Sequence, residues 1–121
     1  MDSLDFVFTE ETSTKTLSAG SGGYLAGVIV SGVDLHDLTA TLTVKVLYTG
    51  LHDGGVGVTV HSASEPANGT YAPFKRMNNT AEADLSGAGE WTRFVIPSGS
   101  TIEISSSANL TADVTVVIEK A

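Results

Sequence analysis

The chain has 121 residues, a formal net charge of −8 and no cysteine. Its length suits one domain with a single core, and the lack of cysteine excludes disulfides, thiolate nucleophiles and cysteine-ligated metal sites. Its 14 acidic residues against 6 lysines and arginines exclude the cationic stripe that a nucleic acid partner requires. We therefore expect one acidic domain over residues 1–121 that folds by packing alone and has no nucleic acid partner.

No stretch approaches the roughly eighteen apolar residues that a membrane-spanning helix needs, so no membrane partner is expected. The first residues, MDSLDFVFTEE, carry acids where a secretory signal carries lysine or arginine, and they lack a long apolar run. The sequence therefore predicts no signal peptide and a protein that is soluble where it is made.

Alternation of apolar and polar residues is the main structural signal along the chain. It is clearest over Leu38–Tyr48, where every second residue is apolar. A period of two is that of a strand with one buried face. In chain order the expected strands are Leu4–Phe8, Thr12–Leu17, Tyr24–Ser31, Leu38–Tyr48, Gly55–His61, Trp91–Ile96, Thr101–Ser106 and Asp113–Glu119.

Clusters of glycine, proline and asparagine separate these strands and supply their turns. No segment of ten or so residues shows the apolar spacing of an amphipathic helix. About eight short strands at regular spacing are typical of a sandwich or barrel. The sequence therefore predicts an all-β domain built as an antiparallel β-sandwich.

Residues 61–90 form a loop-rich excursion in this prediction, because they are poor in β-branched residues and rich in turn formers. A loop of this length in a compact domain is usually functional. It gathers aromatic, methionine and cationic side chains, which are enriched at protein interfaces. The candidate partner-binding residues are Tyr71, Phe74, Lys75, Arg76 and Met77. In the alternative interpretation, Tyr71 and Phe74 fold back to cap the open end of the sandwich.

Residues 1–12 are a second candidate interface. Leu4, Phe6 and Phe8 alternate with polar or smaller residues, so this N-terminal arm can add as an edge strand to a neighbouring subunit. We therefore include Leu4, Phe6 and Phe8 among the partner-binding candidates. The alternative is that the arm joins the sheet of its own chain.

Histidine is the first place to look for chemistry, and two His-Asp doublets occur, His36-Asp37 and His52-Asp53. A doublet can hold a metal ion or orient a general base, but adjacent residues converge only in a turn. Aspartate is also common in turns because its carboxylate binds local backbone amides. We expect both aspartates to be turn residues, and metal binding stays open only because the doublet is repeated.

The sequence offers little support for catalysis. The serine in Gly20-Ser-Gly22 lacks the Gly-x-Ser-x-Gly pattern of a nucleophile elbow. Glu10 with Glu11, or Glu82 with Asp84, has the residue types of an acid–base pair, but spacing alone places neither pair across a cleft. Walker, dinucleotide and calcium-loop patterns do not occur. We therefore expect no enzymatic activity, no cofactor and no metal.

Trp91 is the single tryptophan of the chain. In a carbohydrate-binding sandwich an exposed tryptophan stacks on a sugar, whereas in most sandwiches it fills the core or one end of it. We favour the core for Trp91. A carbohydrate-binding or adhesin module, with Trp91, Tyr71 or Phe74 around a groove, stays as an alternative function.

The chain is small, acidic, cysteine-free, all-β and rich in threonine, serine, glycine and valine. In composition and strand spacing, over its whole length, it resembles small virion proteins of tailed bacteriophages, especially capsid decoration (cement) proteins of the jelly-roll type. The resemblance implies a jelly-roll-like homo-oligomer, with a trimer favoured, that binds the major capsid protein on the outer surface of the shell. It also implies synthesis in the host cytoplasm and a final location on the virion. Another virion component, in a tail, spike or head fibre, is the second alternative.

Overall fold

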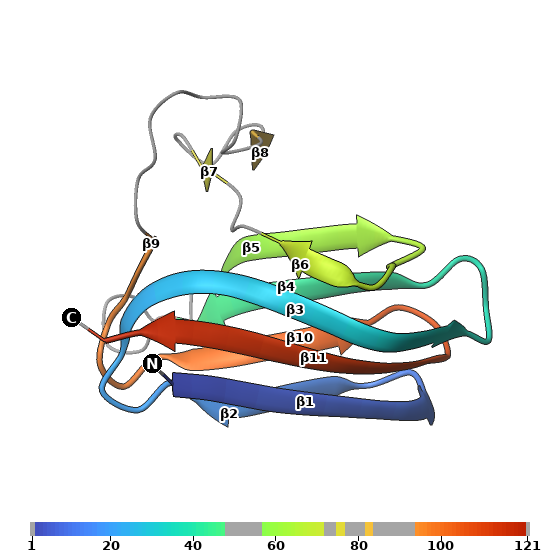
Figure 1. Cartoon of the computed structure of the whole chain (residues 1–121), viewed down its shortest axis with the longest axis horizontal. Helices are drawn as coiled ribbons and strands as arrows, with labels where there is room; N and C mark the ends of the chain where they lie inside the picture. Colours follow the sequence, from blue (N-terminus) through green and yellow to red (C-terminus); the bar gives the residue numbers. More distant parts are fainter. Residues whose placement is uncertain (1, 48–56, 72–74, 77–81, 84–93, 121) are drawn as a thin grey trace.

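The structure is a computed structural model that describes residues 2–47, 57–71, 75–76, 82–83 and 94–120 (Figure 1). All secondary structure in these ranges is β-strand, which confirms the predicted all-β class. The strands are β1 (Asp2–Glu11), β2 (Thr14–Ser18), β3 (Gly23–Leu35), β4 (Thr41–Leu47), β5 (Gly57–Ser64), β6 (Gly69–Tyr71), β7 (Lys75–Arg76), β8 (Glu82–Ala83), β9 (Phe94–Ile96), β10 (Thr101–Ser106) and β11 (Leu110–Glu119).

Two antiparallel sheets pack against each other, as the sequence predicts. One has the order β1-β11-β3-β6, with β9 also paired to β3, and the other has the order β2-β10-β4-β5. Consecutive strands cross repeatedly from one sheet to the other, so almost every neighbour in a sheet is distant in sequence (Figure 1). Nine strands divided in this way between two sheets make the sandwich jelly-roll-like. Within the described ranges, β7 and β8 pair with each other and with no other strand.

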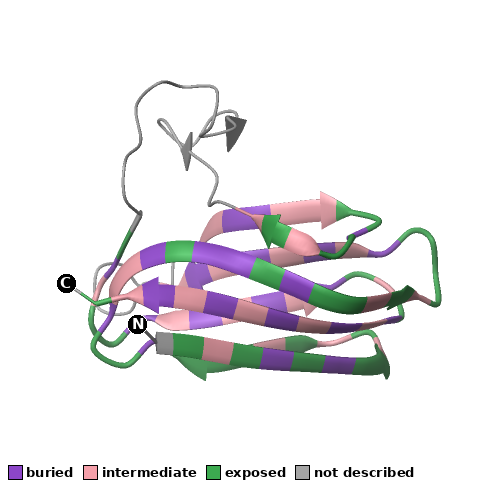
Figure 2. Ribbon diagram, in the orientation of Figure 1, coloured by how far each residue is buried: buried purple, intermediate pink, exposed green. Residues whose placement is uncertain are grey.

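The core lies between the two sheets and is formed by alternate residues of the strands (Figure 2). In β4 and β11 every second side chain is buried and the residues between are partly exposed. This is the pattern expected when one face of each strand packs on the opposite sheet. The largest fully buried side chains are Phe8, Leu25, Leu42, Ile96, Ile102, Ile104, Leu110 and Ile118.

The observed strands differ from the predicted ones where turns and bulges intervene. The strand expected from Leu38 begins instead at Thr41, because Asp37 closes a turn that leaves the Leu38 side chain 70% exposed. β3 continues beyond Ser31, since Gly32 adopts a φ of 62° at a bulge opposite β11. The short strands β6, β7 and β8 of the excursion were not predicted, and Trp91 lies outside the described residues.

Candidate functional site

The structure places Tyr71 against the body of the sandwich. Its half-buried ring packs on the core, with its centroid 4.7 Å from that of the buried His61. Its hydroxyl donates a hydrogen bond of 2.7 Å to the carbonyl oxygen of Ala67. For Tyr71 this geometry agrees with the alternative in which the side chain folds back onto the sandwich.

The other candidates of the excursion are only partly described. Lys75 and Arg76 form β7, in which Lys75 pairs with Ala83 and Arg76 with Glu82. Phe74 and Met77 lie outside the described residues. Partner binding by these four residues therefore stays a prediction.

The arm joins the sheet of its own chain. β1 pairs along its length with β11, which sets Phe6 opposite Val114 and Phe8 opposite Ala112. Phe6 and Phe8 are 2% and 0% exposed and belong to the core, while Leu4 packs partly against it. This corrects the expectation for Phe6 and Phe8, because side chains that fill their own core cannot reach a partner on the surface. The Leu4 side chain keeps some exposure.

The first His-Asp doublet forms a turn, as expected. One carboxylate oxygen of Asp37 accepts hydrogen bonds from the backbone N–H and the hydroxyl of Thr39, at 2.8 and 2.7 Å. These bonds lower the pKa of Asp37. The His36 imidazole lies 3.0 Å from the Thr111 hydroxyl and 3.9 Å from the Asp34 carboxylate.

His52 and Asp53 lie outside the described residues. In the part of the chain that the structure describes, no three His, Asp or Glu side chains are grouped to hold a metal ion. The geometry of the first doublet is thus that of a structural turn, and the second doublet is untested.

Sequence reasoning missed the burial of His61, which is 3% exposed. The pairing of β4 with β5 shifts register between Val44 and Lys45, and this bulge leaves both Val60 and His61 buried. Two consecutive buried residues break the alternation on which strand prediction depends. In the structure the imidazole packs beside the Tyr71 ring, a contact that the sequence does not indicate.

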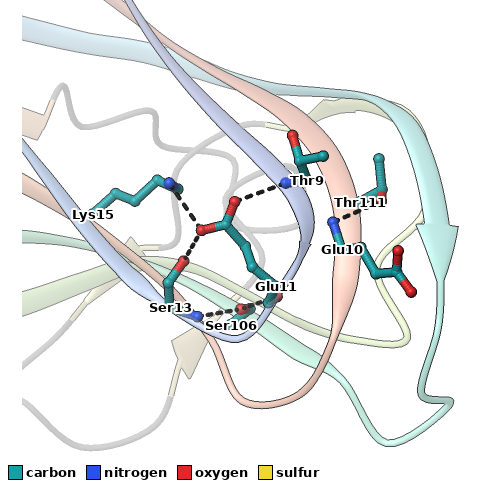
Figure 3. Close-up of polar contacts among 7 residues, drawn as sticks. All are labelled: Thr9, Glu10, Glu11, Ser13, Lys15, Ser106 and Thr111. Atoms are coloured by element: carbon teal, nitrogen blue, oxygen red, sulfur yellow. Dashed lines mark hydrogen bonds and ion pairs between the residues drawn. The ribbon is translucent and has the colours of Figure 1, made fainter.

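The densest polar cluster in the described residues lies where the chain passes from β1 to β2, and we call Glu11, Ser13, Lys15 and Ser106 the corner cluster (Figure 3). The Glu11 carboxylate accepts hydrogen bonds from the Thr9 N–H at 2.8 Å and the Ser13 hydroxyl at 2.7 Å. It also lies 3.0 Å from the Lys15 ammonium. The Ser13 N–H donates to the Ser106 hydroxyl at 3.2 Å, which ties the corner to β10.

Lys15 also packs over the aromatic core, with its ammonium 5.4 Å from the centroid of the Phe8 ring. Its side chain faces inward, because Lys15 pairs with the buried Ile104. An inward-pointing lysine on an edge strand discourages pairing with other chains. The contacts of the corner cluster therefore hold the turn between β1 and β2 and tie it to β10.

The corner cluster predicts a pH dependence of stability. Hydrogen bonds from Thr9 and Ser13, followed by the bond and charge of Lys15, lower the pKa of Glu11 from 4.5 to about 2. Because the folded pKa is the lower one, this contribution is present above pH 4.5 and is lost as the pH falls towards 2. Replacing Glu11 by glutamine should lower the urea midpoint at pH 7 and flatten its fall between pH 4.5 and 2.

The matched control is Glu10→Gln, which removes the neighbouring carboxylate outside the corner cluster and should keep the acid-dependent fall. Identical pH profiles for the Glu11 variant and the unmodified chain would show that the cluster does not contribute.

A second carboxylate arrangement lies on the outer face of the sheet that contains β1 and β11. The register sets Asp5 opposite Thr115 and Val7 opposite Asp113, so Asp5 and Asp113 are diagonal neighbours. Asp5 accepts a hydrogen bond of 3.2 Å from the Thr115 hydroxyl. The bond between the two carboxyl groups, together with burial and the charge of Asp5, raises the pKa of Asp113. One oxygen of Asp113 is shielded from solvent without a hydrogen-bond partner.

We expect Asp113→Asn to raise the free energy of unfolding at pH 7 by about 0.5 kcal/mol, the size of a like-charge penalty between neighbouring strands. Because the pKa of Asp113 is raised in the folded state, the native protein favours the protonated carboxyl group. The stabilisation of the unmodified chain by this protonated form is lost as the pH rises through the folded pKa. The asparagine amide removes the repulsion and can donate to Asp5. Urea denaturation at pH 7 measures the change, and Glu103→Gln on the other sheet should give no such gain.

Of the two candidate acid–base pairs, the structure describes both residues only for Glu10 and Glu11. The Glu11 carboxylate is held in the corner cluster, and the neighbouring Glu10 is exposed (Figure 3). Glu82 lies in β8, and Asp84 is outside the described ranges. Ser21 is an exposed turn residue.

A search of the described ranges for membrane-spanning helices finds none that is long and apolar enough. Comparison of the chain with protein-family models, with curated proteins and with solved structures gives no match.

Proposed function

We propose that this chain is a non-enzymatic structural protein of a tailed bacteriophage, a capsid decoration or cement protein. It binds the outer surface of a shell of major capsid protein and stabilises that shell. It acts as a homo-oligomer, with a trimer favoured. It is made in the host cytoplasm and ends on the virion surface.

The observation that carries this proposal is the strand order β1-β11-β3-β6 packed on β2-β10-β4-β5. This jelly-roll-like sandwich is the architecture that the resemblance to decoration proteins implies.

The charge and the packing of the sandwich add physical support. A net charge of −8 keeps the protein away from exposed nucleic acid and favours a partner surface with basic groups. Nineteen buried apolar residues between the sheets give the described residues one continuous core. A compact acidic domain of this kind is suited to a role outside a shell, where it must resist proteases and bind only at its own footprint.

The experiment mixes the purified chain with DNA-free shells of tailed phages that lack their own decoration protein, and separates bound from free chain on a density gradient. We expect saturable co-migration with the shells and a defined oligomer of the free chain by light scattering. A monomer that binds no shell would contradict the proposal. Binding to tails or fibres instead would favour a role in another part of the virion. Binding in a glycan screen would favour the carbohydrate-binding alternative.

A further inference from the structure

The side of the sandwich at which β1 and β2 lie has two free strand edges. β1 is the last strand of one sheet and β2 is the last strand of the other (Figure 1). Among the described residues, β1 pairs only with β11 and β2 only with β10. The outer edge of β1 is the longer of the two, since β1 has 10 residues and β2 has 5.

The direction of the β1 amides identifies the unpaired groups. The Thr9 N–H donates to the Glu11 carboxylate instead of to β11, so it points to the free edge. Because successive amides of a strand point to opposite sides, those of Ser3, Asp5 and Val7 point to the same free edge. The corner cluster closes this edge at Thr9, and the segment from Ser3 to Val7 is left open.

The inner side of this edge is apolar and incompletely covered. Leu17 pairs with the buried Ile102, so its side chain faces the core side of β2, yet it is 40% exposed. Lys15, on the same face, contacts the Phe8 ring, which places Leu17 further along towards the start of β1. Leu4 is partly buried there. An added strand would therefore find apolar surface beneath its inward-facing side chains.

The outer side of the same edge is acidic. Asp5 and Asp113 form the carboxylate pair described above, and one Asp113 oxygen is shielded without a hydrogen-bond partner. In the described residues neither carboxylate forms an ion pair with lysine or arginine. A side chain on an added strand directly opposite Asp5 would lie about 5 Å away, and a cation at that position would offset the pair.

We propose that the free edge of β1 between Ser3 and Val7 is a docking site for an extended segment of a partner protein. The segment adds as a strand, places apolar side chains over Leu17 and presents a lysine or arginine opposite Asp5. Main-chain hydrogen bonds to the open amides supply affinity, and the alternating side chains supply specificity. The inference deepens the proposed function, on which it rests for the identity of the partner: the segment belongs to the shell subunit.

The test uses the full chain, labelled with ¹⁵N, and a short capped peptide in which valine alternates with threonine and lysine replaces the central threonine. A second peptide carries glutamate at that place. We expect the lysine peptide to shift the amide resonances of Ser3, Asp5 and Val7 and to bind roughly fivefold more tightly than the glutamate peptide, the effect of about 1 kcal/mol. No shift at millimolar peptide, shifts confined to other strands, or equal affinities would overturn the proposal.

Charge reversal provides the matched pair of variants. Asp5→Lys should reverse the preference, so that the glutamate peptide binds more tightly. Glu103→Lys makes the same change of charge on the outer face of the other sheet, opposite Lys45 and Thr16, and should leave the preference for lysine. A preference that Asp5→Lys leaves unchanged would contradict the assigned contact even if peptide binds.

Val7→Pro connects the edge to shell binding. Proline at 7 removes an amide that points away from β11, a position at which an edge strand tolerates proline, and it blocks strand addition. We expect a folded variant that binds neither the lysine peptide nor the shell. If the variant still binds shells, the proposed function stands and the β1 edge is not the shell-binding surface. If the unmodified chain binds the peptide and Val7→Pro does not, but the unmodified chain never binds shells, the edge is a docking site and the shell subunit is not its partner.

Discussion

Replacing Phe8 by alanine is expected to lower the free energy of unfolding by about 3–5 kcal/mol. The side chain is 0% exposed and lies between the two sheets, beneath the Lys15 ammonium. Its removal leaves a cavity and also removes the surface on which Lys15 packs. The loss is a large part of the roughly 5–15 kcal/mol that stabilises a domain, so urea denaturation should show a variant close to its unfolding transition.

Val7→Ala is the matched control for this prediction. Val7 is the next residue of the same strand, but its side chain lies on the outer face and is 51% exposed. We expect its replacement to change stability by about 0.5 kcal/mol or less. Equal effects of the two substitutions would contradict the placement of β1 in the sandwich. If Phe8→Ala instead dissociated an oligomer into folded monomers, the N-terminal arm would be an intersubunit contact.

Gly22→Ala is expected to cost about 2–4 kcal/mol in the free energy of unfolding. Gly22 has a φ of 75° in the turn between β2 and β3, a conformation that costs alanine about 1–2 kcal/mol. A Cβ atom would also meet the backbone of Ile96 and Pro97, at the end of β9. Because backbone atoms cannot rotate away, β9 would have to shift from β3.

Gly20→Ala in the same turn separates these two causes. Gly20 has a φ of 60°, but nothing lies within 4 Å of the position of its Cβ atom. We expect it to lose only about 1 kcal/mol, the cost of the left-handed conformation. Urea denaturation of both variants measures the difference, and equal losses would show that the close approach to β9 is not present in solution.

The fold class could be predicted because one-sided burial leaves a direct trace in sequence. Over Leu42–Val46 the alternation is complete, so the strand and its buried face were evident before the structure. The start of β4 was not, because the apolar Leu38 continues the alternation although the Asp37 turn holds it away from the sheet. Strand order was beyond prediction, since almost every pairing joins residues distant in sequence.

The candidate sites were harder to predict for physical reasons. Phe6 and Phe8 alternate in the same way whether the arm pairs with its own sheet or with a neighbour, so periodicity could not choose between the two. Glu11 and Lys15, four residues apart, suggest a helical ion pair by spacing, and the contact of Ser13 with Ser106 spans 93 positions. The free edge of β1 became visible only once the amide directions were known.

The most direct test of the proposed function is the thermal stability of the shell itself. Calorimetry of DNA-free phage shells, alone and with increasing amounts of this chain, measures the temperature at which the shell disassembles. We expect that temperature to rise with added chain and to level off when every binding position is filled, because a ligand that binds only the assembled state stabilises it by mass action. A disassembly temperature that stays constant at all concentrations would contradict the account.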